Sequence, residues 1–201
     1  MQLCDLVEEE VGLAFVFEET EISGLMRIRP HMFSDDRGLY RKYYEREEFA
    51  DHGIMCAFSE SSDLVSRKGA LRGLHYQLEN PQAKLIHVIS GSLYDVAIDL
   101  RRNSPTFGQY HAELLDGDSD IVLFVPAEFA HGFIALEDRT IFSYQCSGSY
   151  ITTACGGILW NDPALGIPWP IKENGIDRVI ATEKDLHWPT MSECVHSARL
   201  F

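Results

Sequence analysis

The sequence predicts an all-β protein, built as a sandwich or a barrel with a loop-rich C-terminal segment. Short apolar runs recur at intervals of about ten residues along the chain. Many of these runs alternate apolar and polar residues, the pattern of a strand with one buried face. Gly, Pro, Asp and Ser clusters separate them and predict turns. We expect one domain over residues 15–201, preceded by an acidic lead-in at residues 1–14.

The first third of the chain predicts two strands, a short helix and an edge strand. Residues 25–30 (LMRIRP) predict a strand that ends at its proline, and residues 33–40 predict a turn-rich loop that leads to a second strand. Residues 45–52 predict a short helix that stops at Gly53. Residues 59–68 are polar and predict an edge strand followed by a loop.

Residues 69–77 (GALRGLHYQ) are the most informative stretch. Their strand-like alternation carries Arg72 and His75, and Lys84 follows nine residues after the histidine. These side chains are a fixed cation, a proton acceptor that titrates near neutrality, and a second, point-like cation. They suit a groove for an anionic substrate that undergoes proton transfer, although an edge strand with exposed polar residues has the same pattern.

The remaining elements complete the strand series. Residues 84–100 predict two strands around a turn at Ser90 and Gly91, and residues 109–115 and 121–125 predict two more. Residues 126–133 predict a bend that carries His131, and residues 140–147 and 157–160 predict the last strands. The tail is interrupted by prolines and predicts loops with, at most, short helices.

Composition excludes several classes of protein. The formal net charge of −14 argues against a nucleic-acid partner, and no apolar run is long enough to predict a membrane span. Residues 1–10 carry four acids and no basic residue, unlike a secretory signal. The five cysteines are odd in number and form no CxxC pair, so we expect reduced thiols in a cytoplasmic protein.

Three histidines, His75, His87 and His131, lie on or beside predicted strands and raise the question of a metal. Their spacing argues against one, because Gln77 stands two residues after His75 and no His-x-His pair is formed. We therefore expect neither a metal nor another cofactor. His87 lies in an apolar run and suits the core or a pocket wall.

Acid–base chemistry fits these residues better. A neutral His75 can remove a proton from carbon only where a neighbouring carbonyl has acidified it, and Lys84 would then stabilise the enolate oxygen. A tyrosine is suited to return the proton from the opposite face, and Tyr144 and Tyr150 are the candidates. Asp185 would orient His75 if the tail folds back, and is otherwise a solvated charge.

Seven motifs occur along the chain in a fixed order. They are FxxDRG from Phe33, RGLHYQ from Arg72, KL from Lys84, GxxYDVAIDLR from Gly91, SPTFG from Ser104, VPxxFAHGF from Val125 and WNDP from Trp160. In this order and at this spacing, the chain resembles the nucleotide-sugar 3,5-epimerases typified by dTDP-4-dehydrorhamnose 3,5-epimerase, from about Phe17 to Pro189.

The resemblance implies a cupin jelly-roll barrel, usually a homodimer, that epimerises beside a C4 ketone without a metal. It implies that His75 is the general base, Asp185 its partner, and Tyr150 the acid on the opposite face. The other residues that it implies for the substrate are Lys84 and His131 near the 4-keto sugar, Arg72 at the diphosphate, Gln77 in the same motif, and Arg37 and Tyr40 at the nucleotide, often from the neighbouring subunit.

Two departures from the family's pattern bear on the nucleotide base. Lys42 stands where the family usually has a glutamate, and Glu60 and Ser62 stand where it has Gln-x-Asn. Lysine can only donate hydrogen bonds, which suits cytosine N3, whereas Glu60 suits the donor edge of guanine. The alternative is a compensating salt bridge between Lys42 and Glu60, with dTDP held by stacking on Tyr40.

A third departure bears on the number of inverted centres. Residues 151–154 (ITTA) replace a second tyrosine and charged residues of the family. We therefore expect an epimerase that inverts C3, C5 or both in a nucleotide-linked 4-keto-6-deoxy sugar for deoxysugar and polysaccharide precursors. The alternatives are a 3-only epimerase of a CDP- or GDP-linked 4-keto hexose or heptose, a metal-dependent cupin oxygenase, and a catalytically silent binding module.

Overall fold

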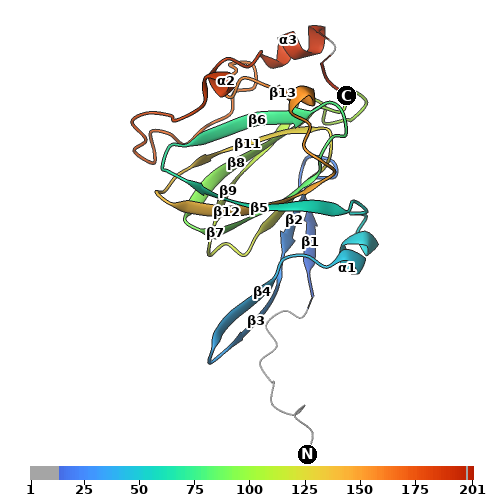
Figure 1. Cartoon of the computed structure of the whole chain (residues 1–201), viewed down its shortest axis with the longest axis vertical. Helices are drawn as coiled ribbons and strands as arrows, with labels where there is room; N and C mark the ends of the chain where they lie inside the picture. The colour runs from blue at the N-terminus through green and yellow to red at the C-terminus, as the bar shows by residue number, and fades with distance from the viewer. Residues whose placement is uncertain (1–13, 198) are drawn as a thin grey trace, which may run out of the picture.

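The chain folds into two antiparallel sheets that face each other as a jelly roll, in a computed structural model that describes residues 14–197 and 199–201 (Figure 1). One sheet has the strand order β1 (Val16–Glu19), β2 (Met26–Arg29), β10 (Val122–Val125), β7 (Lys84–Ser90), β12 (Thr140–Ser147) and β5 (Phe58–Ser66). The other has the order β13 (Cys155–Gly157), β6 (Leu71–Gln77), β11 (Phe129–Ala135), β8 (Ser92–Asp99) and β9 (Tyr110–Asp116). All but residue 14 of the predicted acidic lead-in lies outside the described residues.

The remaining elements lie outside the two large sheets. Strands β3 (His31–Asp35) and β4 (Gly38–Lys42) form a hairpin that projects from one end of the molecule (Figure 1). The helices are short: α1 (Arg46–Asp51), the 3₁₀ turn η1 (Thr152–Ala154), α2 (Glu183–Leu186) and α3 (Met191–His196). No helix among the described residues has the length and apolarity needed to cross a membrane.

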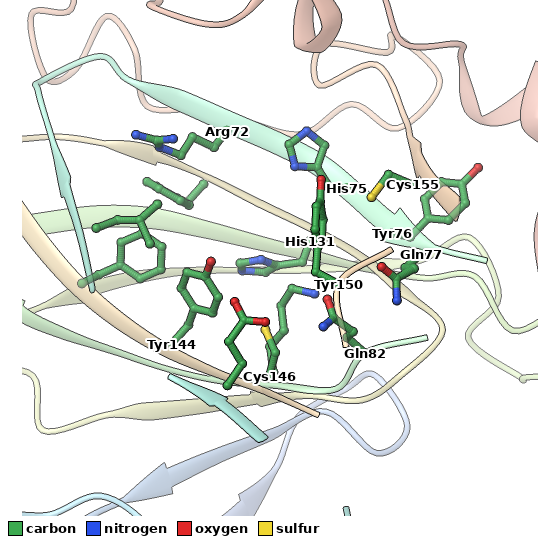
Figure 2. Close-up of a pocket in the computed structure, with 15 residues that line it drawn as sticks. Arg72, His75, Tyr76, Gln77, Gln82, His131, Tyr144, Cys146, Tyr150 and Cys155 are labelled. Atoms are coloured by element: carbon green, nitrogen blue, oxygen red, sulfur yellow. The ribbon is translucent and has the colours of Figure 1, made fainter. Parts of the chain in front are cut away.

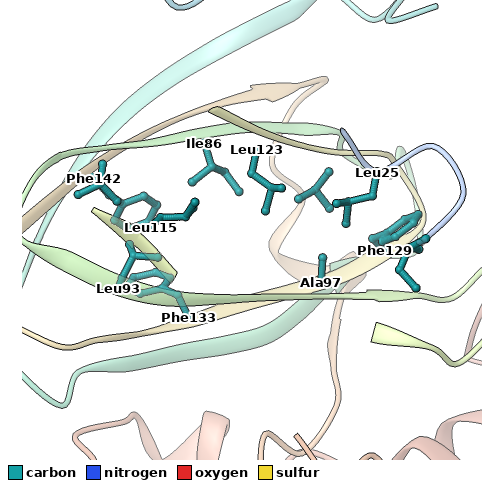
Figure 3. Close-up of a cluster of buried hydrophobic side chains, with 12 residues drawn as sticks. Leu25, Ile86, Leu93, Ala97, Leu115, Leu123, Phe129, Phe133 and Phe142 are labelled. Atoms are coloured by element: carbon teal, nitrogen blue, oxygen red, sulfur yellow. The ribbon is translucent and has the colours of Figure 1, made fainter. Parts of the chain in front are cut away.

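The main core fills the space between the two sheets (Figure 3). Because strand side chains alternate between faces, every second residue of each strand points into this space. On β7 these include Ile86 and Val88, and on β8 they include Leu93 and Ala97. All four are nearly or fully buried, so this end of the interior is a close-packed apolar core.

The outer faces of both sheets are also covered. The C-terminal segment packs on the five-stranded sheet, where Met191 and Leu200 belong to the same buried cluster as Val96 and Ile98 of β8. On the other sheet, Phe49 of α1 joins a second cluster. Strands β8 and β11 are therefore buried on both faces, and β11 is buried at every position.

Most predicted elements are present, including the strands at residues 25–30, 69–77 and 84–100 and the helix at residues 45–52. The predicted bend at 126–133 is wrong, because residues 129–135 form β11 in the middle of the five-stranded sheet. A strand buried on both faces shows no alternation of apolar and polar residues, and Gly132 within it is a residue type that also predicts turns.

Three other boundaries differ from the prediction. Residues 33–40 form most of a hairpin rather than a loop, with strands on both sides of a two-residue turn. Residues 58–66 form one continuous edge strand, paired along its length with β12, and the predicted loop is confined to the residues that follow Ser66. The final strand covers residues 155–157, earlier than the predicted 157–160, and pairs with residues 75–77 of β6.

Candidate active site

A cavity opens between the two sheets beyond the apolar core (Figure 2). Its space for water-sized molecules is about 170 Å³, roughly ten times what a single buried water needs. Strands β5, β6, β7, β11 and β12 and the segment after β12 supply the lining. The lining includes Glu60, Arg72, His75, Gln77, Lys84, His131, Tyr144, Cys146, Tyr150 and Cys155.

Strand alternation explains why these polar groups point inward. Lys84 stands two residues before Ile86 on β7, so both side chains face the interior. On β12, Tyr144 and Cys146 continue the inward row that begins with Phe142. Lys84 is paired with Cys146 across the two strands, so the polar ends of both rows coincide.

The C-terminal segment folds back and places a carboxylate against the histidine of β6. His75 Nε2 and Asp185 Oδ1 are 2.5 Å apart, although 110 residues separate them in the sequence. The reading of Asp185 as a solvated charge is therefore wrong, since this residue is 4% exposed. Burial alone would raise the pKa of Asp185, but hydrogen bonds from His75, Thr182 and Trp188 hold that pKa below its usual value.

The position of Asp185 is fixed by two residues that the sequence did not single out. Thr182 caps α2 by accepting a hydrogen bond from the Asp185 backbone N–H at 3.2 Å. Trp188 donates from Nε1 to Asp185 Oδ1 at 3.2 Å, and its ring meets His75 edge to face. The indole lies directly on Gly157 of β13, where any side chain would collide with it. The sequence does contain a pattern that could have identified Thr182, because a threonine three residues before an acid is typical of a helix N-terminus.

His131 is held by a second buried carboxylate. Its Nε2 lies 2.8 Å from Oδ2 of Asp95, a fully buried residue on the neighbouring strand β8. In the five-stranded sheet His131 is also the register partner of His75. The sequence shows acids on one face of residues 93–100, and the structure reveals that this face points into the barrel.

Lys84 and Glu60 share the cavity with the two tyrosines. Burial lowers the pKa of the Lys84 ammonium, and the Cys146 and Cys155 thiols and the Glu60 carboxylate oppose that shift. Burial likewise raises the pKa of the Tyr144 phenol. Tyr150 is 60% exposed, and a hydrogen bond with the neighbouring Cys155 thiol raises the pKa of its phenol. Tyr150 is therefore protonated at neutral pH.

Other predicted site residues are distributed around the cavity. Arg72 lines its outer part, together with His75, Tyr150 and Asp185. Ser62 is not among the residues that line the cavity, but it is the register partner of Tyr144 across strands β5 and β12. Gln77 is 5% exposed, and its carboxamide hydrogen-bonds to the protein's own backbone.

The predicted nucleotide residues of the hairpin are not brought to the cavity within one chain. Arg37 is bound to Asp35 in the β3–β4 turn, and Tyr40 is 57% exposed. Lys42 Nζ lies 3.6 Å from Glu45, whereas Glu60 lines the cavity. The suggested Lys42–Glu60 salt bridge is therefore not formed within a single chain.

Within residues 14–197 and 199–201, no three His, Cys, Asp or Glu side chains come together as a metal-binding group.

Comparison with known proteins identifies the family. The family model for dTDP-4-dehydrorhamnose 3,5-epimerase matches residues 19–193. The chain belongs to this epimerase family. It is 38% identical over 179 residues to the dTDP-4-dehydrorhamnose 3,5-epimerase of Methanothermobacter thermautotrophicus, covering 89% of this chain and 96% of that protein.

Solved structures give the same result and confirm the cupin jelly-roll fold. A dTDP-6-deoxy-D-glucose-3,5-epimerase from Legionella pneumophila, in complex with dTDP-4-keto-L-rhamnose, has a TM-score of 0.86 and 32% identity over 93% of this chain and 97% of its own. A 3′-monoepimerase from Streptomyces bikiniensis, in complex with dTDP-quinovose, has a TM-score of 0.80 and 28% identity, with 90% of each chain covered. The solved structures that resemble this chain thus include one named for two inverted centres and one named for a single centre.

Proposed function

We propose that this epimerase inverts C3 and C5 of a dTDP-linked 4-keto-6-deoxy sugar by proton transfer between His75 and Tyr150. The observation that carries the proposal is the hydrogen-bonded pair of His75 and the buried Asp185 on the same cavity as the Tyr150 phenol. The relatives' names supply the substrate class, because the family members compared above are named for dTDP sugars.

The first step removes a proton from the carbon next to the ketone. Asp185 is ionised at neutral pH and accepts the Nε2–H of His75, so the lone pair of the neutral imidazole lies on Nδ1. The C–H electrons move to form the enolate, and the proton goes to Nδ1. Asp185 then stabilises the imidazolium that results.

The enolate oxygen requires positive charge or hydrogen-bond donors close by. Lys84 and His131 line the cavity and are the groups placed to supply them. Asp95 accepts the Nε2–H of His131, so His131 can donate to the enolate oxygen through Nδ1 only as an imidazolium, and Lys84 supplies the fixed positive charge.

The second step returns a proton from the opposite face. Tyr150 donates its O–H proton to the carbon, which inverts the centre and leaves a phenolate. Solvent restores both groups: the imidazolium loses its proton to water and the phenolate regains one. C3 and C5 both adjoin the C4 ketone, so the same pair serves both centres after the ring shifts.

The nucleotide end of the site is proposed to include a second copy of the chain. Arg37, Tyr40 and Lys42 lie on a projecting hairpin, so in a homodimer these residues would reach the partner's cavity (Figure 1). Arg72, at the outer cavity, would contact the diphosphate. The free thiols of Cys56, Cys146, Cys155 and Cys194 suit a reducing compartment such as the cytoplasm.

The deciding experiment is incubation with a panel of nucleotide-linked 4-keto sugars in D₂O, followed by NMR and mass spectrometry. We expect deuterium at C3 and C5 of the dTDP-linked sugar, and the His75→Asn variant should lose exchange by about 10²–10⁴-fold. Normal exchange in that variant would reassign the base. Deuterium at C3 alone would make the protein a 3-epimerase.

A second candidate is the same chemistry on a CDP- or GDP-linked sugar. It is favoured by Lys42, which can only donate hydrogen bonds, and by Glu60, a carboxylate lining the cavity. Titration with dTDP, CDP and GDP separates the two, since tightest binding of dTDP would eliminate the second candidate.

A further inference from the structure

The Tyr150 side chain depends on a loop with little structure of its own. Tyr150 lies between the end of β12 at Ser147 and η1, which begins at Thr152. It is 60% exposed, so packing alone does not hold it. An acid that must meet one carbon atom requires a support from elsewhere in the molecule.

Gln77 supplies that support through all three hydrogen bonds of its carboxamide. Nε2 donates to the backbone oxygens of Ser149, at 3.0 Å, and Asn80, at 2.8 Å. Oε1 accepts from the backbone N–H of Ile151 at 2.7 Å. The carboxamide therefore holds the peptide groups on both sides of Tyr150. The opposite amide orientation would place Oε1 against two carbonyls, so only one assignment fits.

The neighbouring contacts strengthen this arrangement. Asn80 Nδ2 reaches the same Ser149 oxygen at 3.4 Å. Gly148 has a φ of +68°, and a Cβ at this position would lie 2.6 Å from the Asn80 carboxamide. The chain thus turns close against Asn80 just before Tyr150, which only a glycine permits without strain.

The position of Gln77 connects the acid to the base. It stands two residues after His75 on β6, and both side chains line the cavity. Two residues of a strand span roughly 6.6 Å. The separation between the base and the loop that carries the acid is therefore set by one rigid strand.

We propose that Gln77 is a positioning residue that places the Tyr150 phenol opposite His75, rather than a substrate ligand. Its amide N–H groups and oxygen are already used by the backbone, and its side chain is almost completely buried. This assignment rests on the proposed roles of His75 and Tyr150.

The test compares Gln77→Glu with the wild-type enzyme in D₂O. Glutamate has the same shape, but its carboxylate cannot donate to Ser149 and Asn80. His75 should still remove the proton, and without an aligned acid the enolate should take deuterium back from the same face. The ratio of deuterated but uninverted substrate to inverted product should rise by about ten- to a hundredfold, with KM changed less than threefold.

Gln82→Glu is the matched control. It places the same charge in the same cavity, but the Nε2 of Gln82 has no hydrogen-bond partner in the part of the chain that the structure describes. Its ratio should stay within twofold of wild type. An equal shift in both variants would assign the effect to charge and overturn the proposal. A raised KM with an unchanged ratio in Gln77→Glu would make Gln77 a substrate ligand and would also overturn it.

A second measurement does not depend on activity. Backbone amide hydrogen exchange of residues 148–152 should accelerate at least tenfold in Gln77→Glu and in Gln77→Met, while β6 stays protected. Unchanged exchange of this segment would refute the positioning role. If the wild-type enzyme inverts no nucleotide sugar, the proposed function fails, and the exchange result still decides whether Gln77 holds the loop.

Discussion

The two ends of the barrel interior are built from the same strands but carry opposite kinds of side chain. On β7 the inward row runs from Lys84 at the cavity to Ile86 and Val88 in the core. On β12 it runs from Phe142 to Tyr144 and Cys146. The apolar end stabilises the fold by burial, whereas the polar end places a cation and phenols in a partly dry cavity at a cost to stability.

The largest expected effect is at the polar end, in Asp185→Asn. An amide cannot stabilise the imidazolium, and it favours the wrong tautomer of His75, so activity should fall by about 10²–10⁴-fold. Turnover of the proposed substrate measures this. Glu183→Gln, an exposed change in the same helix, is the control and should keep full activity. If Asp185→Asn kept an activity close to that of the wild-type enzyme, the His75–Asp185 contact would not be needed for catalysis.

The apolar end should respond in stability instead. Ile86→Ala removes a fully buried side chain two residues from Lys84 and should lower the free energy of unfolding by about 3 kcal/mol. Urea denaturation measures it. Catalysis per folded molecule should stay within a few-fold of wild type, and a loss as large as that of Asp185→Asn would erase the distinction between the two ends.

An outward position on β7 sharpens the comparison through pH. His87 stacks on Tyr43 with ring centroids 3.7 Å apart, and burial lowers the pKa of His87 to about 4, opposed by Asp63 and assisted by Arg41. The unfolded chain binds this proton near pH 6.5, so stability falls as the pH drops from 6.5 to 4. We expect a loss of about 2 kcal/mol after discounting for solvent at the ring's exposed edge.

Denaturation between pH 7 and 4 measures this loss, and His87→Gln should flatten the curve over that range. An identical curve in the variant would assign the pH dependence to other groups.

The smallest expected effect is a gain in stability from Lys84→Met. The ammonium is buried and its pKa is lowered, so below that pKa the folded state bears a cost that an apolar side chain of similar length avoids. The free energy of unfolding at pH 7 should rise by about 1 kcal/mol while epimerisation is lost. A decrease in stability would mean that Lys84 supports the fold as well as the chemistry.

Period-two alternation predicted most strands, since those with one polar face follow the rule that defines the pattern. It failed at β11, which is buried on both faces because the C-terminal segment covers its sheet. A covering segment that is distant in sequence leaves no local signal, so the predicted bend at residues 126–133 was the natural error.

The residues of the candidate site likewise divide into those that the sequence predicts and those that depend on contacts between distant segments. His75, Lys84 and Tyr150 were proposed from residue type and motif, and the structure places them on one cavity. Asp95 and Trp188 were missed, because their contacts with His131 and Asp185 depend on how strands and tail meet in space. The hydrogen bonds from Gln77 to the backbone on both sides of Tyr150 could not be predicted either, because a backbone group can accept or donate at any residue type.

The contact between His75 and Asp185 also determines when this protein becomes competent during its synthesis. A growing chain that has reached Tyr150 already holds the histidine, but the carboxylate is made 35 residues later, roughly two to seven seconds at ordinary translation speeds. Until the tail has left the ribosome and docked on the finished sheets, the nascent chain carries an incomplete dyad. Nascent or truncated products that lack the tail are therefore expected to be inert.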